Sequence, residues 1–422
     1  MTTLPALLVL AGLLPATARP AVAPPPPLQL IARLAIPADA SDTSGLEGVI
    51  GSNIPHNRLS FGSAIHFAPT PEQPHRFIAL PDRGPGDGAS AYRVRYLELA
   101  LQLDAQSPSP LKPIQWRVLA THMLTDEQGG QLWGYTGGFN EHNPAASIRL
   151  DPEGLVVDPA GNLWISDEYG PWLDCFTPGG RRIRRLAPPA GFAVTRQGNP
   201  EQELPPHNAA GRQPNRGLEG LAITPDGAAL VAILQGPLIQ DGALDADNKR
   251  IGHNVRLFRT PLAGGPVRQH IYQLQRPANG VNEILAVSND RFIVLERDGK
   301  AGSEARHRAL YLIDTSVATD VSAIPALPSG PDLSALAGVR PVSKRLLLDF
   351  TDPAFGLTGP DMPEKIEGLS FGPPLPDGRR TLWVSSDNDF RDGVPTWIWV
   401  FALAPEALNP GPAHPTPDPA TR

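Results

Sequence analysis

Carboxylate side chains recur at both ends of a short hairpin in this 422-residue chain. In residues 151–172, Glu153 begins an apolar run, and Asp167 and Glu168 follow a second apolar run across a DPAG turn. Carboxylates brought together in a partly buried place repel one another and are costly to desolvate, so they need basic partners or a bound cation. Oxygen ligands of this kind are those that Ca²⁺ prefers, and a bound cation can activate water for hydrolysis.

The hairpin is repeated along the chain, and a glutamate recurs near the start of its first strand. Each copy is an apolar strand, a turn of strong turn-forming residues, and a second apolar strand. The copies read PEGLVVDPAGNLWISDEYG from 152, LEGLAITPDGAALVAILQG from 218, NEILAVSNDRFIVLERDG from 282 and IEGLSFGPPLPDGRRTLWVSSDN from 366, with a looser copy from 62. Because two further strands fit after each copy, as at 254–262 and 267–275, the repeating unit is a four-stranded antiparallel sheet.

Repeated four-stranded sheets predict an all-β fold, a β-propeller of five or six blades over residues 28–404. Five copies are clear, and GLEGV at 45–49 is a candidate opening of a sixth. The last copy has only TWIWVFAL (396–403) as a third strand, so LQLIARLAI (28–36) is expected to supply the fourth strand and close the ring. A β-sandwich or a pair of domains is the alternative, but neither explains a repeated hairpin with acidic ends. The Pro-rich residues 405–422 are predicted to be a disordered tail.

In a propeller the first strand of each blade lines the central channel, so the repeated glutamates are expected to converge there. The candidate metal ligands, with Ca²⁺ as the expected ion, are Glu153, Glu219, Glu283 and Glu367. Asp167 and Glu168 are candidate ligands or bases at the same mouth, Glu47 is a further candidate carboxylate, and Arg216 is a candidate clamp for an anionic substrate. The structural alternative is that each carboxylate caps main-chain N–H groups or pairs with a nearby base such as Arg83.

The charge, the cysteine count and one motif exclude several kinds of partner and site. The formal net charge of −7 argues against a nucleic-acid partner. Cys175 is the only cysteine, which excludes an internal disulfide and a cysteine-ligated zinc site. GLSFG at 368–372 matches the G-x-S-x-G pattern of serine hydrolases, but it falls inside an apolar strand of the repeat. Because the hydrolase motif needs a strand–turn–helix junction, Ser370 is not predicted to be a nucleophile.

The N-terminal residues predict export. Residues 1–23 contain an apolar run from Leu4 to Leu14 and end in small residues typical of a signal peptide, with cleavage expected after Ala18 or Ala23. The run is too short to span a bilayer, and no other segment is long and apolar enough. We therefore expect a periplasmic or extracellular monomer without an integral membrane segment after cleavage, whose partner is a small anionic or ester substrate.

With these residues in view, the chain resembles the phytase-like esterase family of bacterial secreted proteins ("esterase-like activity of phytase") over most of residues 45–403. The segments that carry the resemblance are ALPDRGPG (79–86), PEGLVVDPAGNLWISDEYGPWL (152–173), NRGLEGLAITPDG (215–227) and IEGLSF (366–371). The second segment is also similar to a strand pair of the calcium-dependent β-propeller phytases, in which an E-G start leads to an acidic cluster. The resemblance implies that Glu153, Asp167 and Glu168 are channel or calcium residues. It implies that Glu219 and Glu367 are their counterparts in other blades.

Two features separate the chain from the true phytases. It has no acidic N-terminal element of the D-D-P type, and the hairpin of Glu219 ends in LQGPL without a carboxylate. The resulting hypothesis is a secreted hydrolase of phosphate or carboxylate esters that uses Ca²⁺ at the central channel. The alternatives are a lactonase on the same scaffold, or a non-catalytic binding propeller whose channel carboxylates hold a structural cation.

Overall fold

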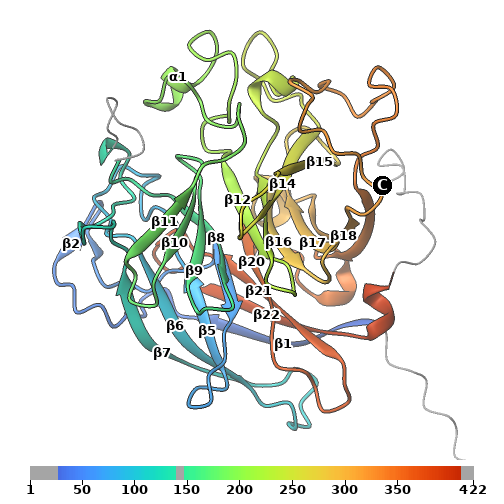
Figure 1. Ribbon diagram of the computed structural model, residues 1–422. Helices are drawn as coiled ribbons and strands as arrows, with labels where there is room; N and C mark the ends of the chain where they lie inside the picture. Colours follow the sequence, from blue (N-terminus) through green and yellow to red (C-terminus); the bar gives the residue numbers. More distant parts are fainter. Residues whose placement is uncertain (1–26, 139–146, 410–422) are drawn as a thin grey trace, which may run out of the picture.

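The computed structural model describes residues 27–138 and 147–409, which form five four-stranded antiparallel sheets around a ring (Figure 1). The predicted all-β propeller is confirmed, and it has five blades. In blades 1 to 4 the strands follow one another from the channel outward. Blade 1 contains β4 (Ala64–Phe67), β5 (Arg76–Leu80), β6 (Arg95–Leu103) and β7 (Ile114–Met123), and blade 2 contains β8 (Pro152–Val157), β9 (Leu163–Asp167), β10 (Leu173–Phe176) and β11 (Arg182–Leu186). Blade 3 contains β12 (Leu218–Ile223), β13 (Ala229–Leu234), β14 (Asn254–Pro261) and β15 (Arg268–Gln273), and blade 4 contains β16 (Gly280–Ala286), β17 (Arg291–Arg297), β18 (Arg308–Asp314) and β19 (Ser343–Asp349).

Blade 5 joins the two ends of the propeller. Its strands, from the channel outward, are β20 (Lys365–Phe371), β21 (Arg380–Asp387), β22 (Thr396–Leu403) and β1 (Leu28–Ile36). The antiparallel pairing of β1 with β22 brings a blue N-terminal strand beside the orange strands of the chain's end in Figure 1. The predicted closure of the ring by the N-terminal strand is therefore present, and it pairs an edge that would otherwise be open.

The segment 45–49 does not open a sixth blade. Val49 begins β2 (Val49–Ile50), which pairs only with β3 (Ile54–Pro55) in a two-stranded hairpin. Glu47 is exposed, so it does not join the channel carboxylates. The hairpin is followed by Arg58, whose Nη1 donates to the carbonyl of Phe390 at 3.1 Å. The stretch between β1 and β4 thus holds a short hairpin next to blade 5, because it is too short for four strands.

The structure explains why Glu and Gly occur together in the E-G-L motif near the start of the inner strands. Glu219 lies in a β-bulge of β12, between Leu218 and Gly220, and a bulge re-aims the side chain that it carries. Gly220 is needed because of the neighbouring strand: a Cβ at this position would lie 2.7 Å from the main-chain nitrogen of Ile284 in β16. Glycine therefore lets neighbouring inner strands approach closely. The inner strands of blades 2, 4 and 5 have an irregularity at the same place.

Apolar side chains fill the interfaces between the blades. Leu97 of β6 packs in one cluster with Trp383 and Val400 of blade 5. Ile78 of blade 1 and Ile165 of blade 2 belong to another cluster. Because residues of a strand alternate between the two faces of a sheet, each blade offers an apolar face to each neighbour. These layers hold the five inner strands in place around the channel.

Short helical turns occur in the connections and after the last strand. They are η1 (Thr136–Gly138), α1 (Pro200–Glu203), η3 (Ile239–Asp241), η4 (Gly302–Glu304), η5 (Pro353–Phe355) and η6 (Pro405–Leu408). The prediction of disorder is wrong for residues 405–409, because Leu408 is buried in a core cluster and its carbonyl accepts a hydrogen bond from Arg291. Residues 410–422 and the predicted signal peptide lie outside the described residues. No helix in the described part of the chain is long and apolar enough to span a bilayer.

Candidate functional site

Charged side chains and one amide from the blades gather at the end of the channel where the inner strands begin. Some stand at the starts of inner strands and others follow the second strands, as the repeated hairpin predicts. We call this end the acidic mouth and define it by Asp82, Arg83, Asp151, Glu153, Glu168, Arg216, Glu219, Asn282, Arg297, Lys365, Glu367, Asp387 and Asp389. Most of these side chains are buried.

One group of three carboxylates comes from blade 2 and contacts Arg83, which follows β5 of blade 1. Asp151, Glu153 and Glu168 each offer an oxygen within 4.8 Å of the others. Arg83 contacts Asp151, and its Nη1 lies 3.4 Å from Glu168 Oε2. Glu153 accepts no hydrogen bond from the residues that the structure describes. Burial, reinforced by Glu219, Asp151 and Glu168, raises the pKa of Glu153 well above its usual range. This group therefore carries more acidic side chains than Arg83 can neutralise.

A second group links blades 3, 4 and 5. Asn282 Nδ2 donates to Glu219 Oε1 at 2.9 Å and lies 3.4 Å from Glu367 Oε1. Gln235 donates to the same Glu219 oxygen at 2.6 Å, and Arg297 donates to Glu367 at 2.7 Å. Glu219 Oε2 and Asn282 Oδ1 are buried and have no hydrogen-bond partner in the described part of the chain. Such oxygens are costly to bury unless something else binds them.

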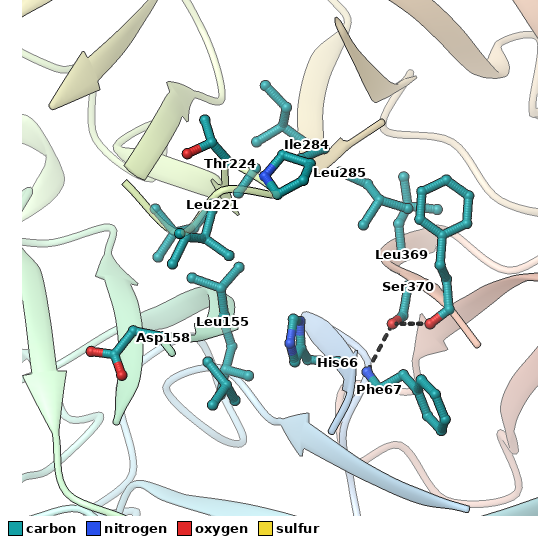
Figure 2. Close-up of a pocket in the computed structure, with 18 of the residues that line it drawn as sticks. His66, Phe67, Leu155, Asp158, Leu221, Thr224, Ile284, Leu285, Leu369 and Ser370 are labelled. Atoms are coloured by element: carbon teal, nitrogen blue, oxygen red, sulfur yellow. Dashed lines mark hydrogen bonds between the residues drawn. The ribbon is translucent and has the colours of Figure 1, made fainter. Parts of the chain in front are cut away.

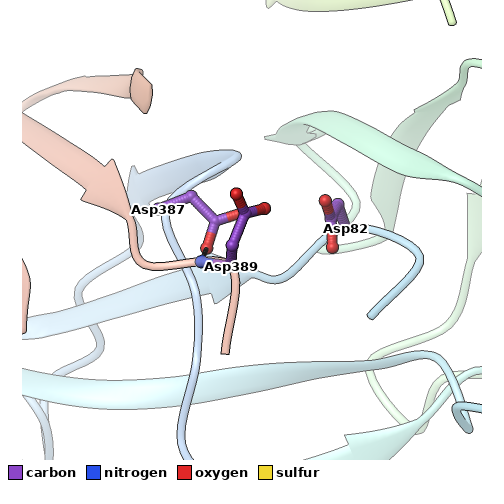
Figure 3. A group of neighbouring side chains, drawn as sticks. All are labelled: Asp82, Asp387 and Asp389. Carbon is purple, nitrogen blue, oxygen red and sulfur yellow. Dashed lines mark hydrogen bonds between the residues drawn. The ribbon is translucent and has the colours of Figure 1, made fainter. Parts of the chain in front are cut away.

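A third group has its own cation. Figure 3 shows Asp387 at the end of β21 and Asp389 just after it, facing Asp82, which follows β5. The three offer oxygens within 4.8 Å of one another. Lys365 Nζ contacts Asp389 and lies 3.3 Å from Asp82 Oδ2 and 3.8 Å from Asp387 Oδ2. Burial opposes the charge of Lys365, but these carboxylates and Glu367 outweigh it and raise its pKa well above the usual range. The ammonium group thus neutralises part of this cluster.

Arg216 presents a buried guanidinium at the mouth. Its Nη1 donates to the carbonyl of Asn279 at 2.7 Å, and its buried Nε has no partner among the described residues. No carboxylate of that part of the chain forms an ion pair with it. Burial and the nearby Arg250 lower the pKa of Arg216 to about 9, so the group keeps its charge at neutral pH. A buried guanidinium without a carboxylate is suited to an anion.

The predicted base Asp167 binds the main chain. Its oxygens accept hydrogen bonds from the N–H groups of Asp151 at 3.0 Å, Tyr169 at 3.1 Å and Gly170 at 2.9 Å. These bonds fix the turn that carries Glu168 into the mouth. The structure thus places Asp167 behind the mouth, as a residue that positions its neighbour.

The predicted ligand Glu283 also faces the main chain. It accepts hydrogen bonds from the N–H groups of Leu221 at 3.0 Å and Ile284 at 2.8 Å. The β-bulge of β16 contains Asn282, so Asn282 and not Glu283 is the counterpart of Glu219. The bulge shifts the correspondence by one residue, which the aligned sequences do not reveal.

Asp151 belongs to the mouth but was not among the predicted site residues. It stands two positions before Glu153 and directly before the first residue of β8, where the chain enters the blade. A carboxylate so close to the repeated glutamate is a local signal by which it could have been found. Its partner Arg83 is 68 positions away, and nothing local links the two.

The opposite end of the channel is apolar. A cavity of about 420 Å³ is lined there by residues that include Leu155, Leu221, Leu285 and Leu369. Figure 2 shows His66 pointing into this opening, and burial together with Arg76 lowers its pKa to about 4. Ser370 Oγ accepts a hydrogen bond from Phe67 N at 2.9 Å and donates one to the carbonyl of Phe371 at 2.8 Å. The hydroxyl therefore links two inner strands, and the acidic side chains of the mouth lie at the other end.

Known proteins similar to this chain include solved structures and a curated relative. Regucalcin from Agrobacterium tumefaciens, a calcium-binding protein, is 9% identical with a TM-score of 0.35, over 89% of this chain and 96% of that chain. Virginiamycin B lyase from Staphylococcus aureus is 12% identical with a TM-score of 0.31, over 89% and 99%. An uncharacterized secreted protein from Arthroderma benhamiae is 28% identical over 287 residues, which are 54% of this chain and 56% of that protein. The chain thus spans just over half the length of this curated relative.

A protein family also matches the chain. The family described as "Phytase-like: Esterase-like activity of phytase" matches residues 59–390. The matched region begins just before β4 and ends after β21, so it includes all five inner strands and the acidic mouth. Because the match extends over most of the sequence, the chain belongs to the phytase-like family.

Proposed function

We propose that the chain is a hydrolase of phosphate or carboxylate esters that acts at the acidic mouth with a bound Ca²⁺. The observation that carries this proposal is a concentration of unpaired polar atoms. Twelve buried side-chain atoms lack a hydrogen-bond partner among the described residues, and six of them belong to the mouth. These six are Arg83 Nε, Arg216 Nε, Glu219 Oε2, Asn282 Oδ1, Arg297 Nε and Asp387 Oδ2. Because unpaired buried atoms are destabilising, their clustering supports a site completed by ligands.

The donor atoms of the mouth fit a calcium ion. Oxygens of Asp151, Glu153 and Glu168 lie within 4.8 Å of one another, as expected for ligands at about 2.4 Å from one ion. Glu219 lies outside this group of three, and its unpaired oxygen and that of Asn282 remain available for a ligand elsewhere in the mouth. Because the set is made of oxygens without His or Cys, it favours Ca²⁺ over zinc. A bound ion would polarise the ester oxygen and lower the pKa of a water molecule.

The remaining groups bind the substrate or orient the ligands. Arg216 would hold the anionic oxygen, either of a phosphate or of the tetrahedral oxyanion formed from a carboxylate ester. Arg83 holds Asp151 and Glu168 beside each other, and Asp167 fixes the turn before Glu168. In this proposal Arg216 is the anion clamp and Asp167 is a positioning residue.

The experiment is thermal unfolding in EDTA and then in Ca²⁺, run beside hydrolysis of p-nitrophenyl acetate, p-nitrophenyl phosphate and a lactone. Ca²⁺ at one hundred times its Kd should stabilise the protein by about 2.7 kcal/mol. Turnover of an ester should require the ion. Glu153→Gln should abolish both effects without destabilising the protein in EDTA, because it removes a repelling carboxylate. Glu304→Gln, an exposed glutamate of η4, is the matched control and should change neither.

The outcomes separate the proposed hydrolase from its alternatives. Stabilisation by Ca²⁺ without turnover of any substrate would favour a binding propeller with a structural cation. Turnover of the lactone alone would favour a lactonase. If Ca²⁺ neither stabilises the protein nor supports turnover, the carboxylates of the mouth have structural roles and the proposal is overturned.

A further inference from the structure

We infer that the non-reacting part of the substrate is apolar and carries no negative charge, and that it binds in a pocket beside Lys365. This inference rests on the proposed ester hydrolysis at the acidic mouth. The pocket measures about 450 Å³ and is lined by residues of the 360–365 segment and of the 387–397 loop. Asp387 and Asp389 belong both to the acidic mouth and to the wall of this pocket. A substrate whose ester group lies at the mouth can therefore extend into it.

Part of the pocket lining is apolar. Its side chains include Pro360, Met362, Val394, Pro395 and Trp397. The indole of Trp397 stacks on that of Trp399 with centroids 6.1 Å apart and an interplanar angle of 13°, which fixes the ring. Pockets that bind organic molecules commonly have this volume and an apolar, aromatic lining with a few polar groups. A ring or an alkyl chain of a substrate would find complementary surface here.

The rest of the pocket lining includes carboxylates, and its two cations, Lys365 and Arg391, already form ion pairs. Lys365 contacts Asp389, and Arg391 Nη2 lies 3.2 Å from Glu364 Oε2 and 3.3 Å from Asp389 Oδ2. Asp387 Oδ2 is buried without a hydrogen bond from the described residues, 3.8 Å from Lys365 Nζ. A phosphate group in this pocket would approach these carboxylates and find no uncommitted cation. A neutral or cationic group would meet no such repulsion.

Charge and shape together select a substrate class. They favour an ester of a neutral, bulky organic group, and they disfavour a compound with phosphates around its whole surface, such as an inositol polyphosphate. The residues that set this preference are Trp397, Val394 and Ala301, which line the pocket and carry no charge.

The experiment compares p-nitrophenyl acetate with p-nitrophenyl hexanoate in Ca²⁺, with inositol hexakisphosphate as the polyanionic substrate. The ratio of kcat/KM for hexanoate over acetate should exceed about tenfold, because each methylene in an apolar pocket adds discrimination. Ala301→Trp and Val394→Trp fill the pocket and should each lower that ratio at least fivefold. Ala263→Trp places the same side chain on the exposed turn after β14 and should leave the ratio unchanged. Inositol hexakisphosphate should not be hydrolysed.

A binding measurement keeps the inference separate from the proposed activity. N-(4-nitrophenyl)hexanamide, which resembles the ester but resists hydrolysis, should raise the Tm of the wild type and not that of Val394→Trp. If no ester is hydrolysed but this shift occurs, the proposed hydrolysis fails and the pocket stands. The pocket inference is overturned if the amide gives no shift or an equal shift in the variant. It is also overturned if hexanoate is not preferred or if inositol hexakisphosphate is a good substrate.

Discussion

Replacing Lys365 by methionine removes the cation from a group of acidic side chains and keeps the length of the apolar stem. Lys365 Nζ lies 3.3 Å from Asp82 Oδ2 and 3.8 Å from Asp387 Oδ2, and it also contacts Asp389. Removing one partner of a buried ion pair costs about 3–5 kcal/mol. Because the side chain of Lys365 is 19% exposed and that of Asp389 is 25% exposed, the lower end applies. We expect Lys365→Met to lower the free energy of unfolding by about 3 kcal/mol at pH 7.

The size of this loss should depend on pH in a defined direction. Burial and the neighbouring Asp82 raise the pKa of Asp387 well above its usual range even in the presence of Lys365. Without the ammonium group, the folded state favours protonation of these carboxyl groups more strongly. A raised pKa in the folded state gives stability that is present at low pH and lost as pH rises through that pKa. The variant should therefore lose least at pH 5 and most at pH 8.

Urea unfolding at pH 5, 7 and 8, first in EDTA and then in Ca²⁺, measures both effects. Lys249→Met is the control, since Lys249 is exposed. Ca²⁺ should restore much of the stability of Lys365→Met. Without the ammonium group, the oxygens of Asp82, Asp387 and Asp389, which lie within 4.8 Å of one another, are free to bind the ion. A loss of equal size at every pH, with no recovery in Ca²⁺, would refute the electrostatic reasoning and leave packing as the role of Lys365.

Two further predictions concern the blades. Gly220→Ala should destabilise the protein by about 2–3 kcal/mol, since its Cβ would lie 2.7 Å from a main-chain nitrogen of the next inner strand. Gly299→Ala, where a Cβ meets nothing within 4 Å, should be nearly neutral, and similar urea midpoints for both variants would contradict this account. Hydrogen bonds from Arg76 and His122 lower the pKa of Glu98 to about 2. A lowered pKa gives stability that is lost as pH falls, so Glu98→Gln should cost about 2 kcal/mol at pH 7 and progressively less below pH 4.5. Urea unfolding of the wild type and of Glu98→Gln between pH 3 and pH 7 measures this loss. A loss of the same size at every pH would contradict the role given to the lowered pKa.

The propeller was predictable because its signals are local. Turn residues at fixed places between apolar runs determine the hairpins, and the strands predicted at 28–36 and 396–403 have the same bounds in the structure. The number of blades was less certain, because the segment 45–49 imitates the E-G start of a blade. Only the pairing of Val49 and Ile50 with a two-residue partner strand shows that no blade begins there.

The site was predictable only in part, since it depends on contacts between distant residues. The glutamates 153, 219 and 367 reach the mouth because each stands at the bulge of an inner strand. Glu283 does not, because the bulge of its strand contains Asn282. The sequence of one blade indicates a charged side chain near the channel, but it does not indicate which residues of other blades neutralise it. Those residues decide how much negative charge remains.

Two acidic groups of the mouth have similar geometry and differ in the cation that each contains. The ammonium of Lys365 is a compact point charge in contact with Asp389 and within 4 Å of the other two carboxylates of its group. Arg83 contacts Asp151 but lies 3.4 Å from Glu168 Oε2, and it forms no ion pair with Glu153 in the described part of the chain. Glu153 is buried and repelled by the neighbouring carboxylates, and it has no cationic partner in the described part of the chain. A divalent ion bound beside Glu153 would therefore relieve the most repulsion. This asymmetry is the physical reason to expect the ion at Glu153 and to expect the organic part of a substrate beside Lys365.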